Sequence, residues 1–206
     1  MEMRLCDRFE GGLGWIVGAG IPRAAHALAV DGGVWLVDPV DAPGLDEEVR
    51  ALGEPRGVVQ LLDRHGRDCA VLATRYGVPH LRVPFAGIPG APFEVLRVVD
   101  VPRWREAALW WPEPRVLVVA DALGTLPYFL VSGETLGVHP LLRLTPPRVL
   151  APLEPEHVLC GHGEGLHGSA VAAALRDTLG GSRRRAPAAY LSALRAVLKS
   201  ARGRAD

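Results

Sequence analysis

Short apolar runs separated by glycine, proline and Asp-Gly pairs dominate the first third of the chain. The runs at residues 13–19, 24–30 and 33–37 are rich, as a group, in β-forming and aromatic residues, and each has the length of a strand. Asp31-Gly32 lies between the second and third runs, which is typical of a tight hairpin. The pattern therefore predicts three strands, the last two joined as a hairpin.

Helical spacing replaces this pattern after Asp38-Pro39. In residues 43–52 the apolar positions recur at helical spacing, and acidic side chains occupy the first turns, where the helix dipole favours them. A second helix is predicted over residues 68–76, ending at a glycine. The apolar runs at 58–62 and 80–83 predict two more strands, so this part of the chain has a β–α–β order.

The second half of the chain is again rich in strands before it becomes helical. Its apolar runs predict four more strands, over residues 93–99, 106–111, 115–120 and 158–160. Its helical patterns predict a short helix at 147–151, a helix at 169–179 that ends at Gly180-Gly181, and a final helix at 187–199. This order indicates a mixed α/β fold in which helices cover sheets.

Composition excludes several classes of protein. With 206 residues, 49% of them hydrophobic and 22% charged, the chain is expected to fold as an ordinary soluble globular protein. The 23 basic and 23 acidic residues cancel, so no global field attracts the chain to nucleic acid or to an anionic membrane. No run of 18 apolar residues predicts a membrane-spanning helix, and the N-terminus lacks the apolar core of a signal peptide. We therefore expect neither a nucleic-acid nor a membrane partner.

Polar residues that directly follow apolar strands are informative, because sites form on the loops at strand ends. Four such places occur, namely Asp38 after GVWLV, the cluster DRHGRD at 63–68 after VVQLL, Asp121 after RVLVVA, and His162 after VLC. Each one alone has a purely structural interpretation as a turn residue, a solvated cluster, a cap or a loop residue. All four in this order favour a functional site.

This order resembles that of the metallo-β-lactamase fold superfamily, over residues 10–180. In that family an aspartate ends an early strand, as Asp38 does, and a ligand loop H-x-H-x-D-H follows the next strand, at the place of DRHGRD. A later strand ends in an aspartate, as at Asp121, and a late strand delivers a histidine between glycines, as at His162. The resemblance implies a four-layer αβ/βα sandwich, with two mixed β-sheets covered by helices.

The resemblance also implies how the chain is divided. We expect a metallo-β-lactamase-like domain over residues 1–181 and a C-terminal helical extension over 182–206. That extension would pack on the outside of the domain or on a second copy of the chain, so a homodimer is one expectation.

The ligand loop departs from the family pattern. Only the second histidine is kept, as His65, while Asp63 and Asp68 stand where the first and last histidines are expected. Arg67 occupies the place of the family's aspartate, and residues 100–104, where a third histidine would fall, contain none. The dinuclear zinc site typical of the family therefore cannot be assembled.

The residues that remain are compatible with at most one divalent ion: zinc, manganese or iron. The candidate ligands are His65, Asp121 and His162, with Asp63 and Asp68 as further candidates. In the metal-free alternative, Arg67 pairs with one of Asp63, Asp68 and Asp121 and holds the loops together.

Two functions follow from these alternatives. The first is a hydrolase of a small ester, thioester or phosphoester, whose catalytic set is Asp63, His65, Arg67, Asp68, Asp121 and His162. The second is a catalytically silent, metal-free relative that binds a small-molecule ligand or a partner.

Four further residues have interpretations of their own. His26 is expected to be a buried strand histidine bonded to backbone. The three cysteines form an odd and scattered set, typical of reduced thiols in a cytoplasm. Cys69 and Cys160 neighbour the candidate site; we favour small buried residues over thiol ligands or nucleophiles. Cys6 has no such neighbourhood.

Overall fold

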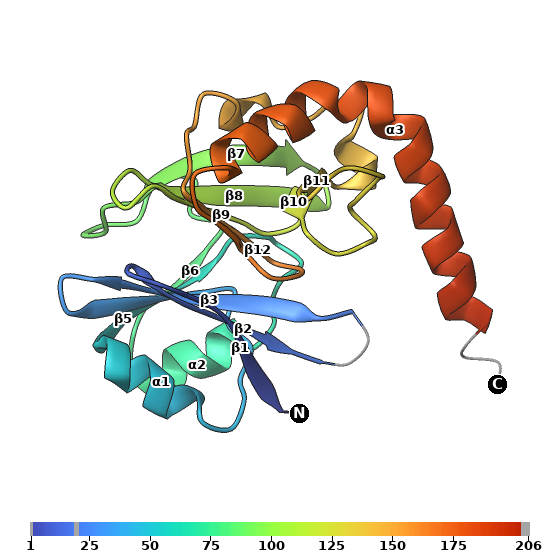
Figure 1. Ribbon diagram of the computed structural model, residues 1–206. Helices are drawn as coiled ribbons and strands as arrows, with labels where there is room; N and C mark the ends of the chain where they lie inside the picture. The colour runs from blue at the N-terminus through green and yellow to red at the C-terminus, as the bar shows by residue number, and fades with distance from the viewer. Residues whose placement is uncertain (1, 19–20, 203–206) are drawn as a thin grey trace.

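The computed structural model describes residues 2–18 and 21–202, which form two β-sheets packed face to face (Figure 1). The first sheet contains, in spatial order, β1 (Met3–Phe9), β2 (Gly12–Val17), β3 (Arg23–Val30), β4 (Gly33–Val37), β5 (Glu54–Gln60) and β6 (His80–Arg82). Pairing is antiparallel from β1 to β4 and parallel from β4 to β6. Helices α1 (Leu45–Leu52) and α2 (Cys69–Tyr76) cover its outer face.

The second sheet has the order β13-β12-β9-β8-β7. Its strands are β7 (Glu94–Val101), β8 (Trp104–Trp111), β9 (Val116–Val119), β12 (His157–Cys160) and β13 (Leu166–His167). The β9–β12 pair is parallel and the other pairs are antiparallel. Between β9 and β12 the chain forms the small ribbon of β10 (Leu123–Gly124) and β11 (Gly137–Val138) and the 3₁₀ turns η1 (Pro140–Leu142) and η2 (Arg148–Leu150). The first part of helix α3 (Val171–Arg202) covers the outer face of this sheet, and the rest of the helix extends away from it (Figure 1).

The predicted four-layer αβ/βα sandwich of two mixed sheets is confirmed. Strand β4 shows why the layers form, because its side chains alternate between two apolar cores. Trp35 and Val37 pack between the two sheets, whereas Val34 and Leu36 pack under α1 and α2. A third core lies between the second sheet and α3. Among the described residues, no helix is both long enough and apolar enough to cross a membrane.

The prediction of two separate C-terminal helices is wrong, because α3 is continuous from Val171 to Arg202. Gly180 and Gly181 lack the positive φ with which glycine ends a helix. The buried face instead continues past them at Ser182 and Ala186, so packing overrides the intrinsic preference of glycine. The helix bends in its middle part (Figure 1), which contains Pro187, and proline removes one hydrogen bond of a helix. The boundary predicted between residues 181 and 182 falls inside this helix.

Strand β1 was not predicted from the sequence. It lies at the edge of the first sheet, and a register shift between Leu5 and Asp7 interrupts its alternation. Residue 1, residue 19 at the end of the predicted strand 13–19, and residues 203–206 of the predicted extension lie outside the described residues.

A buried ion pair organises the segment between β10 and η1. The side chain of Arg143 is fully buried, and it contacts the buried carboxylate of Glu134 at 2.6 Å. It also donates to the backbone carbonyls of Val138 and Phe129. Because each guanidinium nitrogen of Arg143 and both carboxylate oxygens of Glu134 have a partner, the pair holds the aromatic segment around Phe129 in place.

Candidate functional site

Three side chains from separate loops converge at one edge of the two sheets. His65 follows β5, Asp121 follows β9 and His162 follows β12. One potential ligand atom of each lies within 4.8 Å of the others, and the rings of His65 and His162 are 5.6 Å apart at their centroids. The structure thus brings together residues that are 97 positions apart in the chain, from 65 to 162. We call these three residues the central cluster.

Two backbone-anchored contacts orient the histidines of the central cluster. His65 Nδ1 lies 2.9 Å from Asp38 Oδ2, and Asp38 Oδ1 accepts a hydrogen bond from the backbone N–H of Leu61. His162 Nδ1 lies 2.8 Å from the carbonyl oxygen of Pro22. Because each Nδ1–H donates outward, each Nε2 points inward, as metal-binding histidines are usually held.

Asp121 Oδ1 lies between the two inward nitrogens, 3.1 Å from His65 Nε2 and 3.3 Å from His162 Nε2. Neither contact has hydrogen-bond geometry, so this buried oxygen has no hydrogen-bond partner among the described residues. Buried oxygens without a partner are uncommon and call for an explanation. Two imidazole nitrogens and one carboxylate oxygen facing a common point are a donor set that fits a divalent ion.

The electrostatics of the central cluster favour a positive charge. Burial alone would lower the pKa of His65, but the Asp121 and Asp38 carboxylates outweigh it and raise that pKa to about 9. Burial alone would raise the pKa of Asp121, yet contacts with His162 and His65 hold it well below its ordinary value. A proton on His65, or a cation between the ligand atoms, therefore balances these carboxylates.

Glu106, in β8, is a site residue that the sequence interpretation missed. It is fully buried, and its Oε1 accepts hydrogen bonds from the backbone N–H groups of Ala120, Asp121 and Ala122. Its Oε2 accepts from the indole N–H of Trp104. Burial raises the pKa of Glu106 to about 7, and the Asp121 carboxylate adds to the rise. The only sequence signal was a carboxylate within the otherwise largely apolar run WREAALWW.

Arg67 points inward, but the prediction that it pairs with Asp63, Asp68 or Asp121 is wrong. Its guanidinium donates to three backbone carbonyls: those of Ala24 in β3, Asp38 after β4, and Gly161 before His162. Carbonyl oxygens from both sheets are close enough to fill the guanidinium's donor positions, whereas the expected carboxylates are engaged elsewhere. Burial lowers the pKa of Arg67, and Asp38 and Asp121 oppose this.

The structure does not bring Asp63 and Asp68 into the central cluster. Asp63 Oδ2 accepts from the backbone N–H of Arg105, which ties the loop to β8. Asp68 Oδ2 accepts from the backbone N–H of Asp41, which ties the start of α2 to the loop before α1. Both carboxylates therefore stabilise loops, and neither belongs to the group of ligand atoms around Asp121.

His26 and the cysteines lie where a structural role was expected. His26 is buried and its Nε2 lies 3.0 Å from the carbonyl oxygen of Cys160, so the prediction of a backbone-bonded strand histidine is confirmed. Cys69 and Cys160 are both fully buried. Burial raises the pKa of the Cys69 thiol to about 12 and also raises that of Cys160, which disfavours the thiolate that a nucleophile or ligand needs.

A second polar cluster braces the loop that carries the third member of the central cluster. Asp7 of β1 is buried, and its Oδ1 accepts from the backbone N–H of Gly165 and lies 3.0 Å from His167 Nε2. His167 Nδ1 in turn lies 2.9 Å from His157 Nδ1, and the ring of Phe9 stacks on His157. The edge strand β1 thus fixes the loop between β12 and β13.

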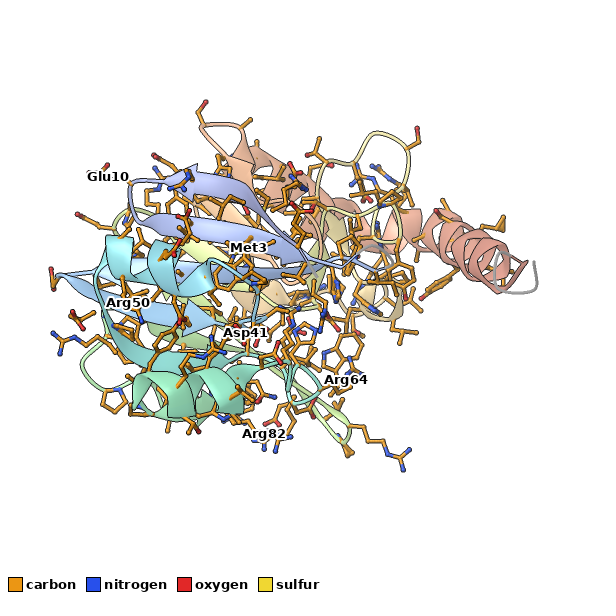
Figure 2. All side chains as sticks on the ribbon, turned by 90° about the horizontal axis from the view of Figure 1, so that it is seen from below. Met3, Glu10, Asp41, Arg50, Arg64 and Arg82 are labelled. Carbon is orange, nitrogen blue, oxygen red and sulfur yellow. The ribbon has the colours of Figure 1, made fainter. Side chains whose placement is uncertain are left out.

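Aromatic rings and one arginine surround the central cluster. Trp104 and His139 meet edge to face with centroids 4.9 Å apart, and Tyr128 lies 5.5 Å from His139. The guanidinium of Arg64, which Figure 2 labels, lies over the Trp104 ring and 3.6 Å from Asp121 Oδ2. Burial lowers the pKa of His139 to about 4, so this ring is neutral at pH 7.

Known structures share this fold. No protein-family model and no curated protein matches the chain. The DIM-1 metallo-β-lactamase matches with a TM-score of 0.61 and 14% identity, over 92% of this chain and 99% of its own. A metallo-β-lactamase from Erythrobacter litoralis matches with a TM-score of 0.60 and 13% identity, over 90% of this chain and 92% of its own. The metallo-β-lactamase FIM-1 from Pseudomonas aeruginosa in its mono-zinc form matches with a TM-score of 0.59 and 10% identity, over 89% of this chain and 97% of its own.

These matches and the layer order together define the class of protein. The chain has the metallo-β-lactamase fold, as the four strand-end residues predicted. At identities of 10–14% the likeness concerns the fold alone.

Replacing Arg67 with methionine is expected to destabilise the protein by about 3 kcal/mol, because three carbonyls lose a charged donor. Urea unfolding followed by circular dichroism measures the difference. Arg82→Met is the matched control, since the Arg82 side chain donates to the carbonyl of Asp63 but is exposed. We expect that control to change the unfolding free energy by less than about 0.5 kcal/mol. Equal effects of the two substitutions would contradict the importance of Arg67.

His139 is expected to make the protein acid-labile. Its pKa is about 4 in the folded chain and 6.5 ordinarily, so between these values the unfolded chain binds a proton that the folded chain does not. Stability is therefore fully present above pH 6.5 and falls as the pH drops toward 4, by at most about 1.4 kcal/mol per pKa unit. Asparagine can keep the acceptor that His139 Nδ1 offers to the Leu141 N–H. Urea unfolding between pH 7 and 4.5 should give a flatter pH dependence for His139→Asn, and parallel curves would refute the assignment.

Proposed function

We propose that the protein is a metal-dependent hydrolase with a single divalent ion, acting on a small ester, thioester or phosphoester. His65, Asp121 and His162 would hold the ion. The observation that carries this proposal is the buried Asp121 Oδ1, which lies between two inward Nε2 atoms without a hydrogen-bond partner among the described residues.

The donor set supports one ion. Two imidazoles and a carboxylate suit zinc, ferrous iron or manganese, and three protein ligands leave a position open. A divalent ion held there would supply Lewis-acid activation of the ester, thioester or phosphoester. The FIM-1 metallo-β-lactamase has been crystallised in a mono-zinc form, so this fold is compatible with a single zinc.

The chain's own residues support the same interpretation. Asp38 holds the His65 ring by its outer nitrogen, and the Pro22 carbonyl does the same for His162. Glu106 fixes the backbone at Asp121. Arg67, which would repel an ion if its charge pointed into the central cluster, instead donates to backbone carbonyls.

A second candidate function is metal-free ligand binding. The observation that favours it is the contact of His65 with two carboxylates, Asp38 and Asp121, which raises the His65 pKa to about 9. A proton on His65 then supplies the positive charge that the central cluster favours.

Location is a separate proposal. We propose a reducing, cytoplasmic environment, supported by three free cysteines of which two are buried. Labelling of the thiols in protein taken directly from cells under acid quench would test it, with labelling of fewer than three thiols counting against it.

Metal content decides between the two functions. Protein incubated separately with zinc, manganese and ferrous iron, then freed of loose ions, is expected to retain about one equivalent of at least one of them by elemental analysis. Asp121→Asn and His162→Gln should retain less than a tenth of an equivalent, while His80→Gln, a histidine of β6 outside the central cluster, should retain the wild-type amount.

Activity follows metal content in this proposal. The loaded wild type should hydrolyse at least one of 4-nitrophenyl acetate, a thioester and 4-nitrophenyl phosphate, and the two central-cluster variants should not. Retention of less than a tenth of an equivalent of every ion by the wild type would end the hydrolase proposal and favour metal-free binding.

A further inference from the structure

Arg64 is a partly exposed cation beside the central cluster, and its polar contacts among the described residues are long. Its guanidinium carbon lies 4.7 Å from the ring centroid of Trp104. Trp104 is itself buried, and its indole N–H donates to the buried Glu106. The platform under Arg64 is therefore rigid, and the cation–π contact limits the positions that the guanidinium can adopt.

The donors of this guanidinium are largely unused. Among the described residues its single hydrogen bond is a long one, 3.4 Å from Nη1 to the carbonyl oxygen of Arg103. Its nearest carboxylate oxygen, Asp121 Oδ2, is 3.6 Å from Nη2, which is beyond hydrogen-bond distance. The Arg64 side chain is 48% exposed, so an anion can reach it from solvent.

Asp121 forms an ion pair with Arg64 at 3.6 Å, a distance too long for a hydrogen bond, so the pair leaves the guanidinium donors available. Asp121 is engaged with His65 and His162 through its other oxygen, and Asp38 is engaged with His65 and Leu61. The neutral ring of Trp104 lies under the guanidinium, and Trp104 in turn meets the uncharged His139 edge to face. A guanidinium that has available donors and stacks on a buried aromatic ring is suited to bind a planar or tetrahedral oxyanion through two hydrogen bonds.

We propose that Arg64 binds the oxyanion of a substrate, a carboxylate or a phosphate attached next to the bond that is cleaved at the central cluster. The position of the cleaved bond rests on the proposed hydrolase function, whereas the binding of the anion does not. The substrate class is therefore an anionic ester, thioester or phosphoester rather than a neutral one.

Calorimetric titration with three small probes tests this proposal. Phenylphosphonate carries the phosphate-like group, benzoate the carboxylate, and benzamide no charge. The titrations use protein freed of metal and protein loaded with zinc, at one low ionic strength because salt screens such contacts. The quantity compared is the ratio of the affinity for each anion to the affinity for benzamide, which a general loss of packing would not change.

The wild type is expected to prefer at least one anion over benzamide with and without zinc. Arg64→Gln should reduce that preference by about 10-fold to 100-fold, the value of hydrogen bonds to a charged group. Arg64→Lys keeps the charge but loses the planar pair of donors, so its preference for the anion should lie between those of the wild type and Arg64→Gln. The preferred probe shows whether the shared oxyanion chemistry belongs to a phosphate or a carboxylate.

Arg82→Gln is the matched control, because Arg82 is an exposed arginine that contacts the same loop at Asp63 and is labelled with Arg64 in Figure 2. It should keep the wild-type preference. The proposal is overturned if the wild type shows no preference for either anion, or if Arg64→Gln keeps the preference with and without zinc. Failure of the chain to bind zinc, manganese and ferrous iron alike would end the proposed hydrolase but would leave the metal-free comparison, and its test of Arg64, intact.

Discussion

The geometry of the site depends on one buried cation, the guanidinium of Arg67. It donates to carbonyls of β3, of the turn after β4 and of the segment after β12, so a single side chain joins the two sheets at their common edge. Two of these carbonyls belong to Asp38, whose carboxylate contacts His65, and to Gly161, the residue that precedes His162. A buried charge without partners is costly, so the folded chain must keep all three segments close to Arg67. The central cluster is assembled as a consequence.

An arginine at this position of the loop limits the chemistry at the same time. The residue at that place in the family pattern is an aspartate, and a cation there removes one potential ligand and adds a repulsive charge. Because the guanidinium donates to carbonyls, the group of three potential ligand atoms at His65, Asp121 and His162 remains together among the described residues. Arg67 therefore stabilises the loops but offers no ligand atom of its own.

Much of the fold followed from patterns visible in the sequence, whereas the partners inside the site did not. The apolar runs before Asp38, Asp121 and His162 predicted strands whose ends meet, and they do. The partners of Arg67 were mispredicted because backbone carbonyls carry no sequence signal, while nearby carboxylates do. Glu106 was overlooked because a single acidic residue in a strand looks like a solvent-facing position. The helix end predicted at Gly180-Gly181 was wrong because packing against the second sheet keeps the chain helical there, and the buried face of α3 continues at Ser182.

Stability and specificity use different residues in this molecule. The groups that hold the central cluster, such as Arg67, Asp38 and Glu106, each form hydrogen bonds with the backbone and are at least half buried. Arg64, by contrast, is partly exposed. Its substitution would remove an ion pair of 3.6 Å with Asp121 but none of the hydrogen bonds described above that orient His65 and His162. Buried residues that hold the site, combined with exposed residues that can be exchanged, allow one fold to accommodate many substrates. Function resides in the site and its loops rather than in the fold.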